Sequence, residues 1–307
     1  MRIAIMGSGG VGTYYGARLV RAGYTVAFIA RGAHLTALQT GGLHVVGLEE
    51  FHIPAVTATD DPAAIGPVDV VLFCVKAYDI EAAARQMLPL VGPRTMVLPL
   101  LNGVDTVERL APIIGGEKVV GGLCRISVEI SAPGTVRINS PFKEIVFGEM
   151  DGSASERTAA FAAALERAEI PHRLSGEMEL ELWKKFVFIT AFSGITGASR
   201  SPIGPIRDCP ETFDLYRRVA AEIVAVGRAA GVELDPDMPD ALVEQARAFA
   251  PGLKASLLVD LERGRRTEVE TLQGTVVRLG RKYGIPTPVT EVLYALIKMH
   301  QPRQSQL

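Results

Sequence analysis

The sequence of 307 residues predicts an α/β domain with a doubly wound, mostly parallel sheet, followed by an all-α domain. Three observations lead to this fold class. Residues 2–30 form a unit of apolar run, glycine-rich turn, helical pattern and second apolar run. Strands, polar loops and helices then alternate to about residue 114, and from Glu177 onwards only helical periodicity remains. We therefore expect a first domain over residues 1–175 and a second over residues 176–307.

The first unit contains a glycine fingerprint. The run Arg2 to Met6 is short enough for a buried strand, and it leads directly into Gly7-Ser8-Gly9-Gly10-Val11-Gly12, which fits G-x-G-x-x-G. Gly7 permits a tight turn, Gly9 removes a Cβ that would block a pyrophosphate, and Gly12 lets the helix pack closely on the strand. The following helix N-terminus offers free N–H groups to phosphates. The pattern predicts a Rossmann domain whose cofactor contacts are residues 7–12.

The end of the second predicted strand, Thr25 to Ala30, indicates which dinucleotide binds. An NAD site usually carries Asp or Glu there for the ribose 2′-hydroxyl, whereas this chain has Arg31 followed by Gly32, with His34 close by. Arginine offers a bidentate fork to a 2′-phosphate, which a carboxylate would repel. The sequence therefore favours NADPH as cofactor. The alternative is an ordinary solvated arginine at a strand end.

The remaining elements of the first domain follow in order. Val68 to Val75 is apolar and rich in valine, which is typical of a parallel strand buried on both faces. Lys76 follows this strand and Asn102 follows the next one, so both should lie with the glycine turn and Arg31 at the carboxyl edge of the sheet. The other expected elements are a short helix or turn at 35–41, a hairpin near the sheet edge at 43–53, helices at 80–90, 106–114 and 153–168, and strands at 96–101, 119–138, 144–148 and 170–174.

Composition excludes several classes of function. The net charge is −2, with no basic block, so neither a nucleic-acid partner nor a membrane-surface role has electrostatic support. The cysteines are far apart and odd in number, which argues for reduced thiols in the cytoplasm and against a zinc site or disulfides: Cys74, Cys124 and Cys209. We expect no metal. A strand beginning at residue 2 leaves no room for a signal peptide, and the apolar runs are too short to span a bilayer.

Two neighbouring lysines in the second half have different surroundings. Lys184 lies on a charged helix face. Lys185 instead belongs to a row of mostly apolar positions spaced by three or four residues: Met178, Leu182, Lys185, Ile189 and Ser193. An inward lysine needs a partner or a chemical role. The alternative is a lysine whose amine reaches water at a domain interface.

A second polar segment precedes the last helical patterns. Thr267 and Glu270 form a plausible capping box, which would begin a helix at Thr267 and place Glu268 in its first turn. Apolar positions 269, 272, 276 and 279 give that helix a core-facing side. Ser256, near the start of the preceding helix, is either a cap or a contact for a substrate carboxylate.

Together these segments resemble the ketopantoate reductase (2-dehydropantoate 2-reductase) family over nearly the whole chain. The matching pieces, in order, are MRIAIMGSGGVG at the N-terminus, Arg31 to Leu35, Val75 to Tyr78, Leu101 to Val104, Leu182 to Lys185, and Ser256 to Gly274.

The resemblance implies a 6-phosphogluconate dehydrogenase-like fold, in which a Rossmann domain precedes an all-helical domain and the site lies in the cleft. It implies NADPH-dependent reduction of 2-dehydropantoate to pantoate, as in pantothenate biosynthesis. Arg31 and Lys76 would hold the 2′-phosphate end of NADP(H), and Asn102 would lie at the nicotinamide side and orient cofactor and lysine. Lys185 matches the catalytic lysine of the family.

The resemblance also implies substrate contacts. Glu268 matches the acidic residue that orients the substrate, and Ser256 the serine at its carboxylate. The family carries asparagines where this chain has Ile189, Ser193 and Ile203. Ser193 remains a predicted substrate contact, whereas the loss of amide groups weakens recognition of a hydroxylated keto acid by about 1 kcal/mol for each hydrogen bond.

Two alternatives follow. One is an NADPH-linked reductase of a different 2-keto acid, and the other is a non-enzymatic NADPH-binding protein. The long helices of the second domain are compatible with a homodimer, although the sequence shows no seam for one.

Overall fold

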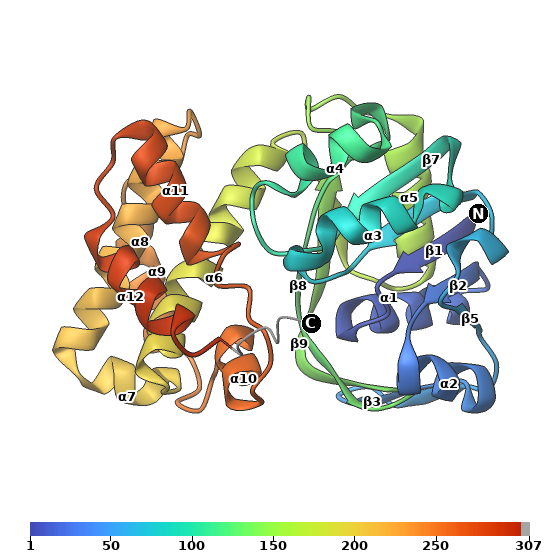
Figure 1. Ribbon diagram of the computed structural model, residues 1–307, viewed down its shortest axis with the longest axis horizontal. Helices are drawn as coiled ribbons and strands as arrows, with labels where there is room; N and C mark the ends of the chain where they lie inside the picture. Colours follow the sequence, from blue (N-terminus) through green and yellow to red (C-terminus); the bar gives the residue numbers. More distant parts are fainter. Residues whose placement is uncertain (302–307) are drawn as a thin grey trace. The chain divides into compact units, whose positions relative to one another are not determined.

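The computed structural model describes residues 1–301 (Figure 1). The chain divides into two compact units, of which the first is Met1–Glu179 and the second begins at Leu180. Each unit has its own core.

The first unit is built on a five-stranded parallel sheet. Its strands are β1 (Arg2–Met6), β2 (Thr25–Ile29), β5 (Thr57–Thr59), β6 (Val68–Phe73) and β7 (Val91–Pro99), in the order β5-β2-β1-β6-β7. Every neighbouring pair is parallel. Strand order reverses at β1, as in doubly wound sheets, so the predicted fold class is confirmed.

Side chains of the central strands enter two different cores because successive residues point to opposite faces. Ile3 and Ile5 of β1 pack in the core that includes α1 (Gly10–Arg21), whereas Ala4 and Met6 pack in the core that includes α3 (Ile80–Gln86) and α4 (Thr106–Ile114). Both faces of the sheet are therefore covered. The other helices of this unit are α2 (Gly32–Gly41), α5 (Glu156–Arg167) and the short turns η1 (Pro62–Ala64), η2 (Ala77–Asp79), η3 (Leu88–Leu90) and η4 (Gly116–Lys118).

A second sheet lies in the same unit, and it corrects one expectation. Its strands are β3 (Leu43–Gly47), β4 (Phe51–Ile53), β8 (Gly121–Ala132), β9 (Thr135–Gly148) and β10 (His172–Leu174). The hairpin expected at the edge of the main sheet was placed wrongly, because β3 pairs in parallel with β9, with Val45 opposite Val136. Both of these side chains are fully buried in the core on the α1 side. Strand pattern predicts the hairpin but not its partner strand.

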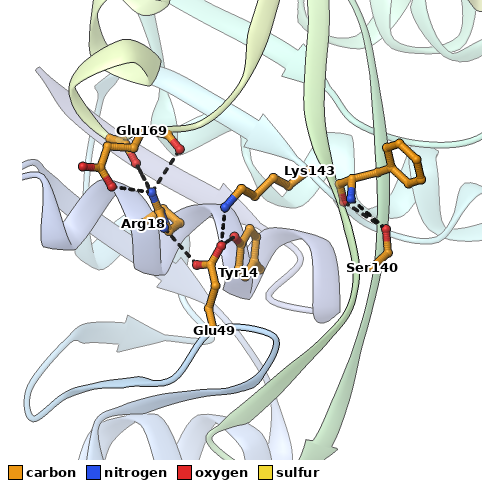
Figure 2. Close-up of polar contacts among 8 residues, drawn as sticks. Tyr14, Arg18, Glu49, Ser140, Lys143 and Glu169 are labelled. Atoms are coloured by element: carbon orange, nitrogen blue, oxygen red, sulfur yellow. Dashed lines mark hydrogen bonds and ion pairs between the residues drawn. The ribbon is translucent and has the colours of Figure 1, made fainter.

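A charged cluster anchors α1 to the elements around it (Figure 2). Arg18 of α1 is buried, and its guanidinium donates to Glu49 at 2.9 Å and to Glu169 at 3.0 Å. Tyr14 and Lys143 of β9 also donate to Glu49. Burial raises the pKa of Glu49, but hydrogen bonds from Lys143 and Tyr14 and the charge of Arg18 outweigh burial, so the net pKa is lowered. The helix that follows the glycine turn is thus held by ionic contacts as well as by apolar packing.

The second unit is helical throughout its described part, as the sequence predicts. It contains most of α6 (Met178–Ser199), followed by α7 (Ile203–Asp208), α8 (Pro210–Ala229), α9 (Met238–Arg247), α10 (Ser256–Glu262), α11 (Gln273–Tyr283) and α12 (Pro288–Lys298). Glu222 of α8 accepts hydrogen bonds from the backbone N–H groups of Val289 and Thr290 at 2.9 and 2.8 Å. These bonds satisfy the otherwise unpaired N-terminus of α12. Among the described helices, none has the length and apolarity needed to cross a membrane.

The expected helix start at Thr267 is wrong. Residues 268–272 form a bend and turns, and α11 begins at Gln273. The carboxylate of Glu270 does not close a capping box. It accepts from the hydroxyl of Tyr294 and pairs with Lys298 at 2.8 Å, both on α12. A capping pattern depends on neighbouring residues only, so it does not predict partners this distant in the sequence.

Candidate active site

The glycine turn after β1 has the geometry that its sequence requires. Gly7 has φ +94°, and a Cβ there would lie 2.7 Å from a side-chain carbon of Val75. A Cβ on Gly12 would lie 2.5 Å from the carbonyl oxygen of Gly7 and 2.6 Å from Ile5, so α1 packs directly on β1. A Cβ on Gly9 would meet nothing within 4 Å. Two of the glycines thus serve the fold, whereas Gly9 leaves open space at the N-terminus of α1.

The polar groups of the turn are held in a defined orientation. The Ser8 N–H donates to the last carbonyl of β2 at 3.0 Å, and the Ser8 carbonyl accepts from the Thr13 hydroxyl at 3.0 Å. The Ser8 hydroxyl is buried and has no partner among the described residues. A Cβ on Gly10 would lie 2.9 Å from the Val128 carbonyl oxygen of β8, and Val11 packs against the α1 core. The turn therefore lies between β2 and β8, and it contains one buried hydroxyl that no described residue satisfies.

The other predicted cofactor residues lie along the same edge of the sheet. Arg31 follows β2, Lys76 follows β6 and Asn102 follows β7. Because all these strands are parallel, their carboxyl ends meet at one edge, in the order Arg31, glycine turn, Lys76 and Asn102. Arg31 is exposed and donates to the side-chain oxygen of Gln86 at 2.5 Å, whereas Lys76 and Asn102 are half-buried. The structure thus places the predicted residues of the first unit along one edge of the sheet.

His34 connects this edge to the second sheet, a role that the sequence did not indicate. Its Nδ1 accepts from the Gly134 N–H at 3.1 Å, and its Nε2 lies 3.4 Å from the Thr13 hydroxyl. Burial lowers the pKa of His34 and so favours the neutral ring. Because Nδ1 accepts from the Gly134 N–H, the proton of the neutral ring is on Nε2. The start of α2 is therefore linked through His34 to α1 and to the β8–β9 turn.

The two lysines of α6 differ as their helical positions predict. Lys184 is exposed and Lys185 is half-buried. Ser193, two turns further on, is buried, donates to the Thr190 carbonyl at 3.3 Å and accepts from the Gln273 amide at 3.1 Å. The Ser193 hydroxyl is therefore engaged within the second unit.

The remaining predicted residues lie on either side of the link between α10 and α11. Glu268 is buried in the bend before α11, where its carbonyl accepts from the N–H groups of residues 271 and 272. Ser256 is the exposed first residue of α10 and is not the cap, since Ala255 precedes it at that position. Gln273 also donates to the Thr190 carbonyl at 2.8 Å. One buried amide thus ties the segment carrying Glu268 to the helix carrying Lys185.

Comparison with known proteins identifies the family. Residues 3–152 match the family described as ketopantoate reductase PanE/ApbA, and residues 177–301 match its C-terminal part. The chain belongs to the ketopantoate reductase family. It is an oxidoreductase of the 2-dehydropantoate 2-reductase type, and membership implies a nicotinamide cofactor.

Individual members of the family resemble the chain over nearly its full length. A 2-dehydropantoate 2-reductase of Archaeoglobus fulgidus is 33% identical over 97% of both chains. An uncharacterized oxidoreductase of Bacillus subtilis, YkpB, is 30% identical over 98% of this chain and 99% of its own. The crystal structure of a PanE/ApbA family ketopantoate reductase from Ralstonia eutropha superimposes with a TM-score of 0.91, at 33% identity and complete coverage of both chains.

Two positions where the ketopantoate reductase resemblance leads us to expect asparagine carry apolar side chains. Ile189 is half-buried on α6. Ile203 is fully buried at the start of α7, where its N–H donates to the Leu253 carbonyl at 3.0 Å. Neither side chain can hydrogen-bond to a hydroxylated substrate.

Proposed function

We propose that this chain reduces a 2-keto acid to the 2-hydroxy acid with NADPH. The observation that carries the proposal is the alignment of Arg31, the glycine turn, Lys76 and Asn102 along one carboxyl edge of the parallel sheet. In this proposal residues 1–175 bind NADP(H), and residues 176–307 provide the substrate and catalytic groups.

The first unit fits a dinucleotide phosphate at three places. The open space beside Gly9 lies at the N-terminus of α1, where backbone N–H groups favour a pyrophosphate. The buried Ser8 hydroxyl supplies a further hydrogen-bond donor. Arg31 and Lys76 provide positive charge for a 2′-phosphate, and Arg31 can form a bidentate contact. Residues 7–12 therefore hold the pyrophosphate, and the charge on Arg31 favours NADPH over NADH.

In the proposed mechanism, NADPH supplies the hydride that reduces the C2 carbonyl carbon. Lys185, positively charged, stabilises the negative charge that develops on the carbonyl oxygen and then gives that oxygen a proton from Nζ. The resulting neutral amine regains its proton from water. Glu268 keeps the substrate and the lysine oriented, and Asn102 orients the nicotinamide side.

In this proposal Ser256, which is exposed at the start of α10, binds the substrate carboxylate. Ser193 was also predicted to contact the substrate. Because its hydroxyl already donates to Thr190 and accepts from Gln273, we propose that Ser193 links α6 to α11 and does not contact the substrate directly.

Two substrates are candidates. The names of the relatives support 2-dehydropantoate, whose product would be pantoate in the pantothenate pathway. The apolar positions Ile189 and Ile203 favour a different 2-keto acid. Both candidates require the same cofactor and the same lysine.

Oxidation of NADPH and of NADH, monitored with 2-dehydropantoate and with other 2-keto acids, tests the proposal. We expect NADPH oxidation with at least one of these acids and a higher KM for NADH than for NADPH. Tight NADPH binding without turnover of any 2-keto acid would favour the non-enzymatic alternative.

A further inference from the structure

The surface of α6 that follows Lys185 is apolar and partly aromatic. Phe188, Ile189 and Phe192 come three, four and seven residues after Lys185, so they lie on the same side of the helix. Phe192 is buried, whereas Phe188 and Ile189 are half-buried and keep part of their surface accessible. The side chains nearest to Lys185 in the C-terminal direction are therefore hydrophobic.

A third aromatic ring joins this surface from a distant segment. Phe188 and Phe192 stack with ring centroids 5.7 Å apart, and Phe249 meets them edge-on at 6.0 and 5.9 Å. Phe249 is itself half-buried. Such edge-to-face contacts contribute free energy in addition to that gained from burying the apolar area of the rings. We call Phe188, Ile189, Phe192 and Phe249 the aromatic surface.

The backbone around Phe249 is held firmly against α7. The Arg207 guanidinium donates to the carbonyl oxygens of Arg247 and Phe249, both at 2.9 Å. The N–H of Gly204 donates to the Pro251 carbonyl at 2.9 Å, and a Cβ at Gly204 would lie 2.9 Å from that same oxygen. The position of the aromatic ring is thus fixed by contacts on both sides of it in the sequence.

The polar side chains interleaved with these residues on α6, and the Gln273 amide that bonds to them, are buried. The Thr190 hydroxyl and the Gln273 side-chain oxygen have no partner among the described residues, but both atoms are buried and do not reach the accessible part of the surface. Ser193 is buried with its hydroxyl bonded to Thr190 and Gln273, and Ile203 has only an apolar side chain, fully buried. A substrate hydroxyl placed against such a surface loses its water without gaining a partner, which costs roughly 1–3 kcal/mol. An apolar substituent gains from the same burial.

We propose that the side chain of the substrate is apolar, either branched aliphatic or aromatic, and that Phe188, Ile189 and Phe249 receive it. This inference rests on the proposed function, since Lys185 must act at the keto group. The reaction is unchanged: one hydride from NADPH reaches C2, one proton from Lys185 reaches the oxygen, and a 2-hydroxy acid leaves.

A matched pair of substrates gives the sharpest test. Trimethylpyruvate differs from 2-dehydropantoate only in having a methyl group in place of the hydroxymethyl group. Apolar pockets discriminate against an added hydroxyl by up to about 100-fold, whereas a pocket built to bind that hydroxyl rejects the analogue lacking it by about 10⁴-fold or more. We expect kcat/KM for trimethylpyruvate to exceed that for 2-dehydropantoate by about 10- to 100-fold.

Variants locate the effect on the aromatic surface. Ile189→Asn should lower the ratio of kcat/KM for trimethylpyruvate to kcat/KM for 2-dehydropantoate by about tenfold. This is the effect of one hydrogen bond that the asparagine offers to the hydroxyl of 2-dehydropantoate. Lys184→Asn, on the exposed side of the same helix, should leave the ratio unchanged. Phe249→Ala should reduce kcat/KM for phenylpyruvate more than for pyruvate, with thermal unfolding and NADPH affinity recorded to confirm that the variant is folded.

The outcomes separate this inference from the proposed function. If the wild type prefers 2-dehydropantoate over trimethylpyruvate, the inference that the substrate has an apolar side chain is wrong, whereas the proposed NADPH-dependent reduction still holds. If no 2-keto acid supports NADPH oxidation, the proposed function itself fails. An Ile189→Asn variant with the wild-type ratio would remove Ile189 from the site.

Discussion

The glycine turn allows the fold and the cofactor site to be perturbed separately. In Gly12→Ala the new methyl group would lie 2.5 Å from the Gly7 carbonyl oxygen, 0.9 Å short of the 3.4 Å at which ordinary contact begins. Helix α1 must therefore move away from β1. Overpacking of this kind costs about 1–3 kcal/mol, and replacing glycine within a helix returns up to about 1 kcal/mol. We expect a net loss of about 1–2 kcal/mol, which lowers Tm by roughly 2–8 °C for a unit of this size.

Gly9→Ala is the matched control for the fold. Its methyl group meets nothing within 4 Å, and φ −77° suits any residue, so stability should change by less than about 0.5 kcal/mol. The methyl group nevertheless enters the space that we propose for the pyrophosphate. NADPH affinity should fall at least tenfold, or about 1.4 kcal/mol.

Thermal unfolding by circular dichroism and NADPH titration by fluorescence measure the two effects. If Gly9→Ala binds NADPH as well as the wild type, the pyrophosphate does not lie at the N-terminus of α1. If Gly12→Ala keeps the wild-type Tm, the close packing of α1 on β1 does not contribute measurably to the stability of the fold.

Three further predictions concern charged groups. Lys185→Ala should lose most of kcat and retain NADPH binding, whereas Lys184→Ala, on the exposed side of α6, should keep both; equal kcat values would remove Lys185 from the mechanism. Arg31→Ala should raise KM for NADPH far more than for NADH, and equal increases would refute the 2′-phosphate contact. The pKa of Glu49 is lowered in the folded state from its ordinary 4.5, so its contribution to stability is present above about pH 4.5 and is lost as pH falls through the folded pKa. Unfolding measured near neutral pH and at about pH 4 should therefore show a smaller decrease in Tm for Glu49→Gln than for the wild type.

Local patterns in the sequence account for much of the first unit. The valine-rich run at residues 68–75 predicts β6 as a strand buried on both faces, and the structure places it between β1 and β7. The glycine turn and the contrast between Lys184 and Lys185 were predicted in the same way. Each of these features depends on residues within about two turns of helix or one strand. The pattern of side chains by itself therefore contains the information.

Tertiary structure alone decided which distant segments meet. The hairpin β3–β4 joins a second sheet through β9, and Glu270 pairs with α12 instead of starting a helix. Gln273 hydrogen-bonds to Ser193, and the Phe249 ring packs edge-on against Phe188 and Phe192 of α6. A chain sequence determines which face of an element is apolar, but the partner of that face depends on register and packing among residues many positions apart. The pattern of apolar residues along the chain thus determined where the strands and helices form. Which of these elements contact one another around the candidate site was decided by tertiary packing.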